Sequence, residues 1–527
     1  MPAAASKVSS PVGGNPEALT TAGDPARLAP ALVPLDDPTL ARRALHQSFF
    51  RAVAWTGSVK WIGQLVTWPV TILIAKLLSP GDYGFITLVS TLTRFMALVT
   101  EGGVGLAIVT NPGLRDREMR QLNGFALLLG LGAIACCLIL ARPVAVLTHD
   151  PAAARVLMVL SVTLLLDAAT IVPTAQLRRS FRYRDLALLE AMRSLVTLTA
   201  TLWFASHGFG YWSLVFGYAL GSFTQSASTV IVARVAVARP HWTDIGPTLR
   251  VSVHLLVGNI GEFVSSNTDR LVGGLVLGSA ALGGYTFAWV LAFTPSEKIT
   301  SMVARVVPSL FGRMRDRPSE IIRYSLRIAE TVSMITLPAF VGLALIADQV
   351  VGVLLGTKWL GAVGPLRAFC AYAAVLDCML VIPHALTASS EVRPLSQNAL
   401  IAMLVYPPLF FVLGTTFGTT GLALTWAIVG TVLNLRLLRV MSRRLGMSLR
   451  AYGRSLLPAV SSCLVMAVAV LGARLLVVPR LHPVGGLLAV LSVGMASYVA
   501  ALFALHGERI RATIAFVMEQ RRTPEPA

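Results

Sequence analysis

The chain is a succession of long apolar runs separated by short polar segments. A helix needs about 20 residues to cross the hydrocarbon layer of a membrane, and about 14 runs reach this length. The pattern predicts transmembrane helices over residues 53–78, 84–109, 122–141, 156–175, 187–206, 211–233, 251–277, 282–309, 326–347, 364–388, 396–414, 419–439, 455–473 and 484–505. We therefore predict an all-α integral membrane protein with no soluble domain large enough to fold alone.

The basic residues between these runs predict the topology. Arg178, Arg179, Arg182 and Arg184 crowd one predicted inside loop, whereas the predicted outside loop near 348–363 has one basic residue. Summed over the chain, the inside segments hold about four times as many Lys and Arg residues as the outside segments, as the positive-inside rule requires. We therefore predict an even number of spans, with the N- and C-termini in the cytoplasm.

Composition supports the membrane assignment. Hydrophobic residues make up 55% of the 527 residues and charged residues 13%, about half of the share that soluble proteins carry. The net charge of +19 does not predict nucleic-acid binding, because the basic clusters lack aromatic neighbours and topology explains them. The five cysteines lie inside apolar runs without CxxC spacing, so we expect neither disulfides nor a zinc site. We expect no cofactor or metal.

An internal repeat divides the predicted spans. The segment Ala75–Phe85 after the first span is similar to Gly274–Phe287 after the seventh, with Tyr83 aligned to Tyr285. Spans 1–6 and 7–12 then form two related six-helix bundles of the same orientation, and spans 13 and 14 are appended. Parallel repeats are typical of transporters, with the substrate path between the halves. The predicted parts are a disordered cytoplasmic tail, two bundles, two appended helices and a second cytoplasmic tail, over residues 1–44, 45–240, 241–445, 446–507 and 508–527.

Ionisable residues inside the spans are the candidates for function. Such groups are costly in lipid, so they face a protein interior or a water-filled cavity. They concentrate on spans 1, 2, 7 and 8, at Lys60, Arg94, Glu101, Glu262, Asp269, Arg270, Glu297 and Lys298, with Asn267 among them. Any one of them can instead pair with a neighbouring helix or extend its head group to the interface. Taken together, they predict a polar substrate cavity.

Several short motifs add a family resemblance. Leu77–Gly84 resembles the "LLSPxDYG" segment of polysaccharide transporters, and Ser180–Ala187 resembles their basic loop before span five. Asn267–Gly274, followed by Tyr285, resembles their span seven. Glu101 stands where these relatives more often have Asp, so the side chain is longer but carries the same charge. Over about residues 45–505, the chain is identified as a member of the oligosaccharide-flippase (Wzx-like) branch of the multidrug/oligosaccharidyl-lipid/polysaccharide exporter superfamily.

The resemblance implies a transporter rather than an enzyme. Its substrate would be a polyprenyl-diphosphate-linked oligosaccharide, moved between leaflets of the bacterial inner membrane by alternating access for exopolysaccharide, O-antigen or capsule synthesis. The predicted substrate-cavity residues are Lys60, Arg94, Asn267, Arg270 and Lys298, with the four cations as diphosphate partners. Residues that would titrate or bind Na⁺ are Glu101, Glu262, Asp269 and Glu297. The expected partners are the lipid-linked oligosaccharide, membrane lipids, and polymerase and export components of the same pathway.

Two other functions remain open. A cation-coupled multidrug exporter of the same superfamily generally has twelve spans, and predicted spans 13 and 14 argue against it. A membrane polysaccharide polymerase would need a sizeable outside loop with catalytic side chains. The longest predicted outside loop, 348–363, offers Asp348 and Lys358 alone as charged residues.

Overall fold

The computed structural model describes residues 67–522, apart from 111–112 and 316. These residues lie within one compact unit, Thr56–Ala527. The predicted N-terminal tail, Lys60 and most of the first predicted span fall outside the described residues. A short apolar helix, Thr67–Leu77, opens the described part.

The described part of the chain is helical throughout. Its α-helices are α2 (Pro80–Glu101), α3 (Val104–Thr110), α4 (Asp116–Thr148), α5 (Ala152–Arg179), α6 (Tyr183–Ser206), α7 (Trp212–Ala233), α8 (Trp242–Val272), α9 (Ser279–Gly312), α10 (Pro318–Leu345), α11 (Ala347–Val350), α12 (Val363–Cys378), α13 (Val381–Ala388), α14 (Arg393–Leu445), α15 (Leu449–Leu476) and α16 (Pro483–Arg522). Among the described residues, nine helical stretches are long and apolar enough to cross a membrane. The predicted all-helical, multi-span architecture is confirmed.

Helix α14 merges two predicted spans. It runs for 53 residues, but Gly418 has φ 61° and ψ −145° and interrupts its helical path. This position lies between the predicted spans 396–414 and 419–439. Because a positive φ is strained for residues with a Cβ, a glycine suits this break.

The start of α2 shows why one recognisable motif folds as it does. Ser79 is the N-cap, and its hydroxyl accepts a hydrogen bond from the Asp82 backbone N–H at 3.1 Å. The Asp82 carboxylate accepts the Ser79 backbone N–H at 2.9 Å, which completes a capping box. Pro80 occupies the first turn, where its missing N–H costs nothing. The Ser-Pro-Gly-Asp motif is therefore a helix start.

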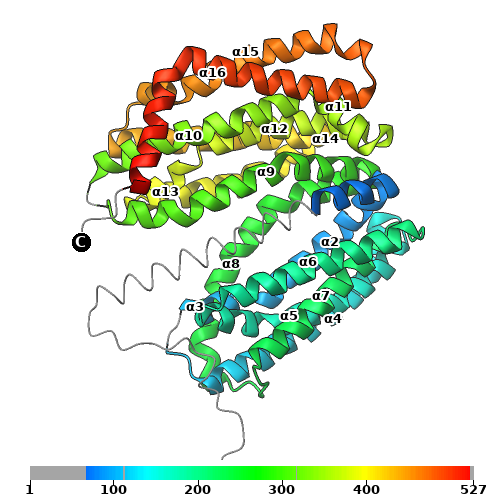
Figure 1. The fold of residues 1–527 in the computed structure, drawn as a ribbon. Coiled ribbons are helices and arrows are strands. Elements are labelled where there is room, and N and C mark those ends of the chain that lie inside the picture. The colour runs from blue at the N-terminus through cyan, green and yellow to red at the C-terminus, as the bar shows by residue number, and fades with distance from the viewer. Residues whose placement is uncertain (1–66, 111–112, 316, 523–527) are drawn as a thin grey trace, which may run out of the picture. The chain divides into compact units, whose positions relative to one another are not determined.

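The helices form two groups, and α8 contacts both of them. In the first helix group, α2–α7, α4 packs on α5 and α6 on α7 (Figure 1). In the second helix group, α9–α16, α12 contacts α10 and α14, while α15 contacts α10 and α16. Arg474 of α15 forms a 2.6 Å ion pair with Asp348 of α11. The last two helices are thus attached to the second group.

Helices α2 and α9 meet at a crossing that only glycine permits. A Cβ on Gly84 would lie 1.7 Å from the Ser279 carbonyl oxygen, and one on Gly283 would lie 1.8 Å from the Pro80 oxygen. Each glycine is the fifth residue of its helix. Gly84 and Gly283 therefore occupy equivalent positions at the starts of α2 and α9.

A second junction joins the same two groups. The 3-10 helix Thr357–Ala362 brings the Lys358 ammonium to the carbonyl oxygens of Lys76 and Leu78, at 2.7 and 2.6 Å. The Trp359 indole N–H donates to the Ala75 oxygen at 3.0 Å. These donors satisfy carbonyls at the end of the helix Thr67–Leu77, which lack partners within that helix.

Candidate functional site

A cavity of about 450 Å³ lies among helices of the first group, with Phe263 of α8 in its wall. Its lining comes mainly from α2, α5, α6 and α7. The ionisable side chains that line it are Arg94, Glu101, Asp167, Arg178, Glu190 and Arg193. A neighbouring cavity of about 240 Å³ shares Arg94 and Asp167 and adds Thr93, Thr163 and Tyr218. The first group therefore surrounds a space whose lining includes six ionisable side chains.

The spacing on α2 explains part of this lining. Arg94, Ala97, Leu98 and Glu101 all line the larger cavity. Residues three, four and seven positions apart share one face of an α-helix. One face of α2 therefore presents a cation and a carboxylate about two turns apart.

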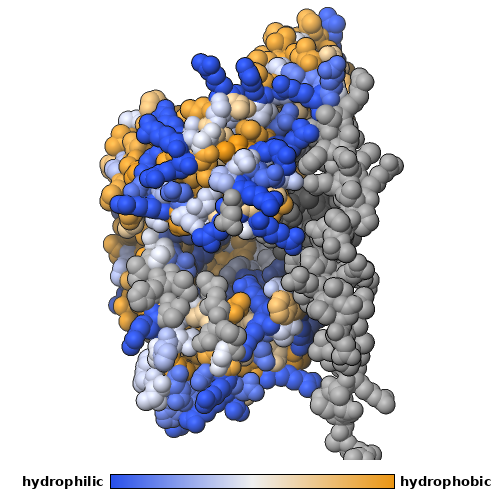
Figure 2. Space-filling view, turned by 90° about the vertical axis from the view of Figure 1, so that its left-hand side faces the viewer, coloured by the Kyte–Doolittle hydropathy of each residue, from blue (hydrophilic) through white to orange (hydrophobic). Residues whose placement is uncertain are grey.

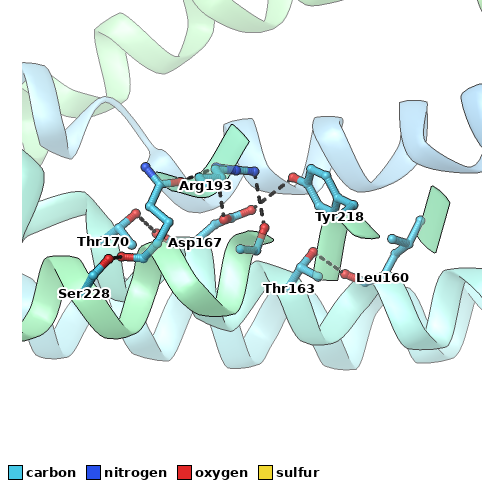
Figure 3. A network of polar contacts seen from close by, with 9 residues as sticks. Leu160, Thr163, Asp167, Thr170, Arg193, Tyr218 and Ser228 are labelled. Atoms are coloured by element: carbon cyan, nitrogen blue, oxygen red, sulfur yellow. Dashed lines mark hydrogen bonds and ion pairs between the residues drawn. The ribbon is translucent and has the colours of Figure 1, made fainter. Parts of the chain in front are cut away.

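Three helices supply a network of paired charges (Figure 3). The Arg193 guanidinium of α6 lies 3.9 Å from the Asp167 carboxylate of α5, and the Tyr218 hydroxyl of α7 donates to the other Asp167 oxygen at 3.4 Å. Arg193 also lies over the Tyr218 ring, 5.2 Å from its centroid, and donates to Gln225 and Ser222. The charges of Arg193 and Asp167 thus offset each other within the wall.

Arg94 differs from Arg193, because among the described residues it forms no ion pair with a carboxylate. Its side chain is exposed although it lies in the middle of α2. The positive charge of Arg270, on the neighbouring helix α8, acts on Arg94. Two like charges near each other repel, and an anion between them relieves that repulsion. Arg94 and Arg270 together can therefore bind an anionic group.

Arg270 is held in place by its own helix and by α9. Its guanidinium donates to the Asn267 side-chain oxygen and lies 5.9 Å from the ring centroid of Trp289. The Asn267 amide in turn donates to the Phe263 backbone oxygen at 2.9 Å. Neutral partners thus orient Arg270 without cancelling its charge.

Asp269, the neighbour of Arg270, points into a sealed environment. It is 1% exposed and accepts hydrogen bonds from the Tyr285 hydroxyl at 2.5 Å and the Trp426 indole N–H at 3.1 Å. Its other oxygen accepts the Arg270 backbone N–H at 2.8 Å. Asp269 therefore ties α8 to α9 and α14. Its predicted role in ion coupling stays a prediction.

The remaining predicted residues are scattered. Glu262 and Glu297 are exposed and do not line either cavity. Lys298 lies on α9, but its side chain is outside the described part, as is all of Lys60. The structure thus brings Arg94 and Glu101 to one cavity, whereas Asn267, Asp269 and Arg270 of α8 line neither cavity. Among the described residues no cluster of three His, Cys, Asp or Glu side chains could hold a metal ion.

Three further cavity residues are not among the predicted site residues. Asp167 lies on α5 and Glu190 and Arg193 lie on α6, and all three are charges inside predicted spans 4 and 5. Their place inside apolar runs is the signal that the sequence offers. Which of them face one space depends on how α5, α6 and α7 pack.

The multi-span helical fold is similar to the folds of known membrane transporters. The structure resembles the lipid II flippase MurJ in an inward closed conformation, with a TM-score of 0.70 at 14% identity over 87% of this chain and 100% of that one. It also resembles an inward-facing multidrug resistance MATE transporter, with a TM-score of 0.57 at 15% identity over 72% and 94% of the two chains. At these identities the likeness establishes the fold alone.

Sequence comparison supplies the family. A family model described as "Polysaccharide biosynthesis protein" matches residues 73–364. The lipopolysaccharide biosynthesis protein WzxC of Escherichia coli K12 is 22% identical over 399 residues, which cover 73% of this chain and 79% of that protein. The chain belongs to the polysaccharide biosynthesis protein family, and its identification as a Wzx-like transporter rather than an enzyme is confirmed.

Proposed function

We propose that the protein moves a polyprenyl-diphosphate-linked oligosaccharide across the bacterial inner membrane for exopolysaccharide, O-antigen or capsule synthesis. The observation that carries this proposal is the cavity lined by Arg94, an arginine without an ion pair among the described residues, with the charge of Arg270 acting on it from α8. The family match and the similarity to WzxC, a lipopolysaccharide biosynthesis protein, support the same substrate class.

The chemistry of a diphosphate suits this pair. A guanidinium forms two parallel hydrogen bonds with phosphate oxygens, and charge-assisted bonds of this kind are about twice as strong as neutral ones. Arg94 approaches from α2 and Arg270 from α8, so one diphosphate can contact both. Lys60 and Lys298 remain proposed additional partners, and Asn267 supports Arg270.

The polar lining suits the sugar. Thr100, Thr170, Thr174 and Gln225 line the larger cavity and offer hydroxyl and amide groups. Phe263 offers an aromatic surface on the same wall. Arg193 and Asp167 compensate each other, so they can bind sugar hydroxyls without favouring a second anion. The polyprenyl chain stays in the lipid.

Alternating access would work through the contacts between α2 and α9. The glycine crossing and the Lys358 and Trp359 junction hold the two helix groups together near Ala75–Gly84 and Ser279–Gly283. Opening on that side requires these contacts to break. Glu101, Glu262, Asp269 and Glu297 remain the proposed coupling residues, and Glu101 alone of the four lines the cavity.

The finer architecture belongs to the same proposal. About 14 spans in two six-helix bundles, two appended helices and cytoplasmic termini fit the observed helices. Helices α15 and α16 follow the two predicted six-helix bundles and weigh against the multidrug-exporter alternative, since such exporters generally have twelve spans.

The test uses a strain that lacks the gene and carries plasmid-borne variants. Lipid-linked oligosaccharide should accumulate on the cytoplasmic leaflet and surface polysaccharide should fall. Arg94→Gln should lower transport by about tenfold to a hundredfold, the effect of losing one or two charge-assisted bonds. Arg443→Gln, which changes an exposed arginine of α14, is the matched control and should transport normally. Unchanged surface polysaccharide in the deletion strain would overturn the proposal.

A further inference from the structure

A separate cavity of about 510 Å³ lies between α10, α15 and the last part of α16. It shares no lining residue with the two cavities of the first helix group. Its lining consists of Leu326, Arg327, Glu330, Ser448, Arg450, Ala451, Arg454, Ser455 and Arg509. The transport mechanism proposed above uses none of these residues.

The charge of this cavity is strongly positive. Four arginines line it against a single carboxylate, Glu330, which is 8% exposed and lies 3.7 Å from the Arg327 guanidinium. Arg509 donates to the Arg454 backbone oxygen at 3.3 Å, which fixes its position at the rim. Within the described residues, neither Arg450 nor Arg454 forms an ion pair with a carboxylate. The lining therefore carries an excess of positive charge.

The backbone adds to this potential. Helix α15 starts at Leu449 with Ser448 as its N-cap, and Ser448, Arg450 and Ala451 all line the cavity. The first turn of a helix presents backbone N–H groups without helical partners and the positive end of the helix dipole. A helix of 28 residues has a full dipole, so this turn attracts anions together with the arginines.

A stripe of exposed apolar side chains continues from the same face of α15. Arg450 and Arg454 are followed at helical spacing by Leu457, Leu464 and Val468, of which the last two are 65% and 73% exposed. A molecule bound with its anionic end at the arginines can lay a hydrocarbon chain along this stripe. Figure 2 views the left-hand side of Figure 1, where the C-terminal part of α16 lies, and shows many hydrophilic side chains on that face.

We propose that this cavity binds the phosphate headgroup of an anionic membrane phospholipid, whose acyl chains lie along α15. Basic residues that served only to orient the chain in the membrane would be spread over the cytoplasmic loops. Here they line one cavity with a buried carboxylate, a helix start and an apolar track. The bound lipid would fasten the last two helices to α10. The site is independent of the proposed transport function, because its test measures binding and not transport.

The experiment titrates the purified full-length protein in detergent with dioctanoyl phosphatidylglycerol and counts bound lipid by native mass spectrometry. The test variant is Arg450→Gln/Arg454→Gln, and Arg443→Gln removes an exposed arginine outside the cavity. We expect one saturable site, unchanged in Arg443→Gln and about thirtyfold weaker in the double variant, as expected for two lost arginines near an anionic headgroup. Arg450→Lys/Arg454→Lys keeps the charge and should retain most binding.

Three comparisons distinguish the source of the phosphate. Dioctanoyl phosphatidylcholine should bind far more weakly, and inorganic phosphate should not compete at equal concentration. Geranylgeranyl diphosphate should bind equally to the wild type and the double variant, since its proposed site is Arg94 and Arg270. Equal phosphatidylglycerol binding by the double variant, or an equal loss in Arg443→Gln, would overturn the proposal. Effective competition by inorganic phosphate, or a matching loss of geranylgeranyl diphosphate binding, would overturn the assignment to a phospholipid.

Discussion

The interiors of the two helix groups differ in kind. The first group encloses polar cavities lined by Arg94, Asp167 and Arg193. In the second group, aromatic side chains fill the space between α9, α12 and α14, and they include Tyr285, Trp289, Phe293, Phe369, Tyr372, Tyr406, Phe410 and Trp426. Within the described residues, the first group thus holds cavities with ionisable linings, whereas the space between α9, α12 and α14 of the second group is packed with aromatic side chains.

This difference indicates that the first interior serves ligand binding and the second serves stability. Arg193 and Asp167 are partly accessible and 3.9 Å apart, so water or a ligand can replace their contact. Asp269 is sealed between Tyr285 and Trp426, where no water replaces a lost partner. Substitutions in the first interior should therefore alter ligand binding, whereas those in the second should alter stability. The predictions below test this contrast, from the largest expected effect to the smallest.

Asp269→Ala should cause the largest loss of stability. It removes the acceptor of the Tyr285 hydroxyl and the Trp426 indole and leaves both donors buried without a partner. Each such donor costs about 1–3 kcal/mol, so the free energy of unfolding should fall by about 3 kcal/mol or more. Thermal unfolding in detergent measures it. Asp167→Ala is the matched control and should lose about 1 kcal/mol; equal losses would contradict the contrast.

Gly84→Ala should come next. Its Cβ would lie 1.7 Å from the Ser279 oxygen, so α2 and α9 must separate. Overpacking of this kind costs about 1–3 kcal/mol, and we expect about 2 kcal/mol in thermal unfolding. Gly453→Ala on α15 meets no atom within 4 Å and serves as the control, with no loss expected. A tolerated Gly84→Ala would show that the crossing is not a tight contact.

Arg193→Gln should affect stability little. The side chains of Arg193 and Asp167 are 29% and 26% exposed, and accessible pairs contribute about 1 kcal/mol at most. Transport should fall more than stability, because the cavity loses a sugar-binding group and gains an uncompensated carboxylate. Comparing transport with unfolding temperature in one preparation checks this. A stability loss as large as that of Asp269→Ala would contradict the assignment of the first interior to ligand binding.

The smallest expected effect is a pH dependence at Asp244, which lies at the start of α8 outside the predicted spans. The Gln121 amide donates to its carboxylate at 2.9 Å, and this bond, with Arg117 nearby, holds the pKa of Asp244 below its usual range. Thr243 and His241 act in the same direction. Because the pKa is lower in the folded state, the ionised carboxylate stabilises the fold above the unfolded-state pKa of about 3.9. This stabilisation is lost as the pH falls through the folded-state pKa.

The unfolding temperatures of the wild type and of Asp244→Asn are measured in buffers from about pH 6 to about pH 3. The wild type should lose slightly more stability than the variant as the solution becomes acidic. Parallel curves would show that the Gln121 and Arg117 contacts do not stabilise the folded state.

The sequence predicts the helices far better than it predicts the site. Apolar runs mark helices because lipid exposure leaves a continuous pattern, and even the break at Gly418 falls between two predicted spans. Arg94 and Glu101 follow from their helical spacing on one helix. The environment of Asp269 does not follow from local spacing, because its hydrogen-bond donor Trp426 lies 157 residues further along the chain. Whether a buried carboxylate is free or sealed depends on such distant neighbours.

The central claim is that Arg94 and Arg270 bind one diphosphate together. A double-mutant cycle with Arg94→Gln, Arg270→Gln and both changes, measured as the dissociation constant for geranylgeranyl diphosphate, tests it most directly. We predict that each single change weakens binding by about tenfold to a hundredfold and that the double change costs clearly less than the product of the two, because both arginines contact one ligand. Unchanged binding in either single variant, or full additivity, would contradict the account.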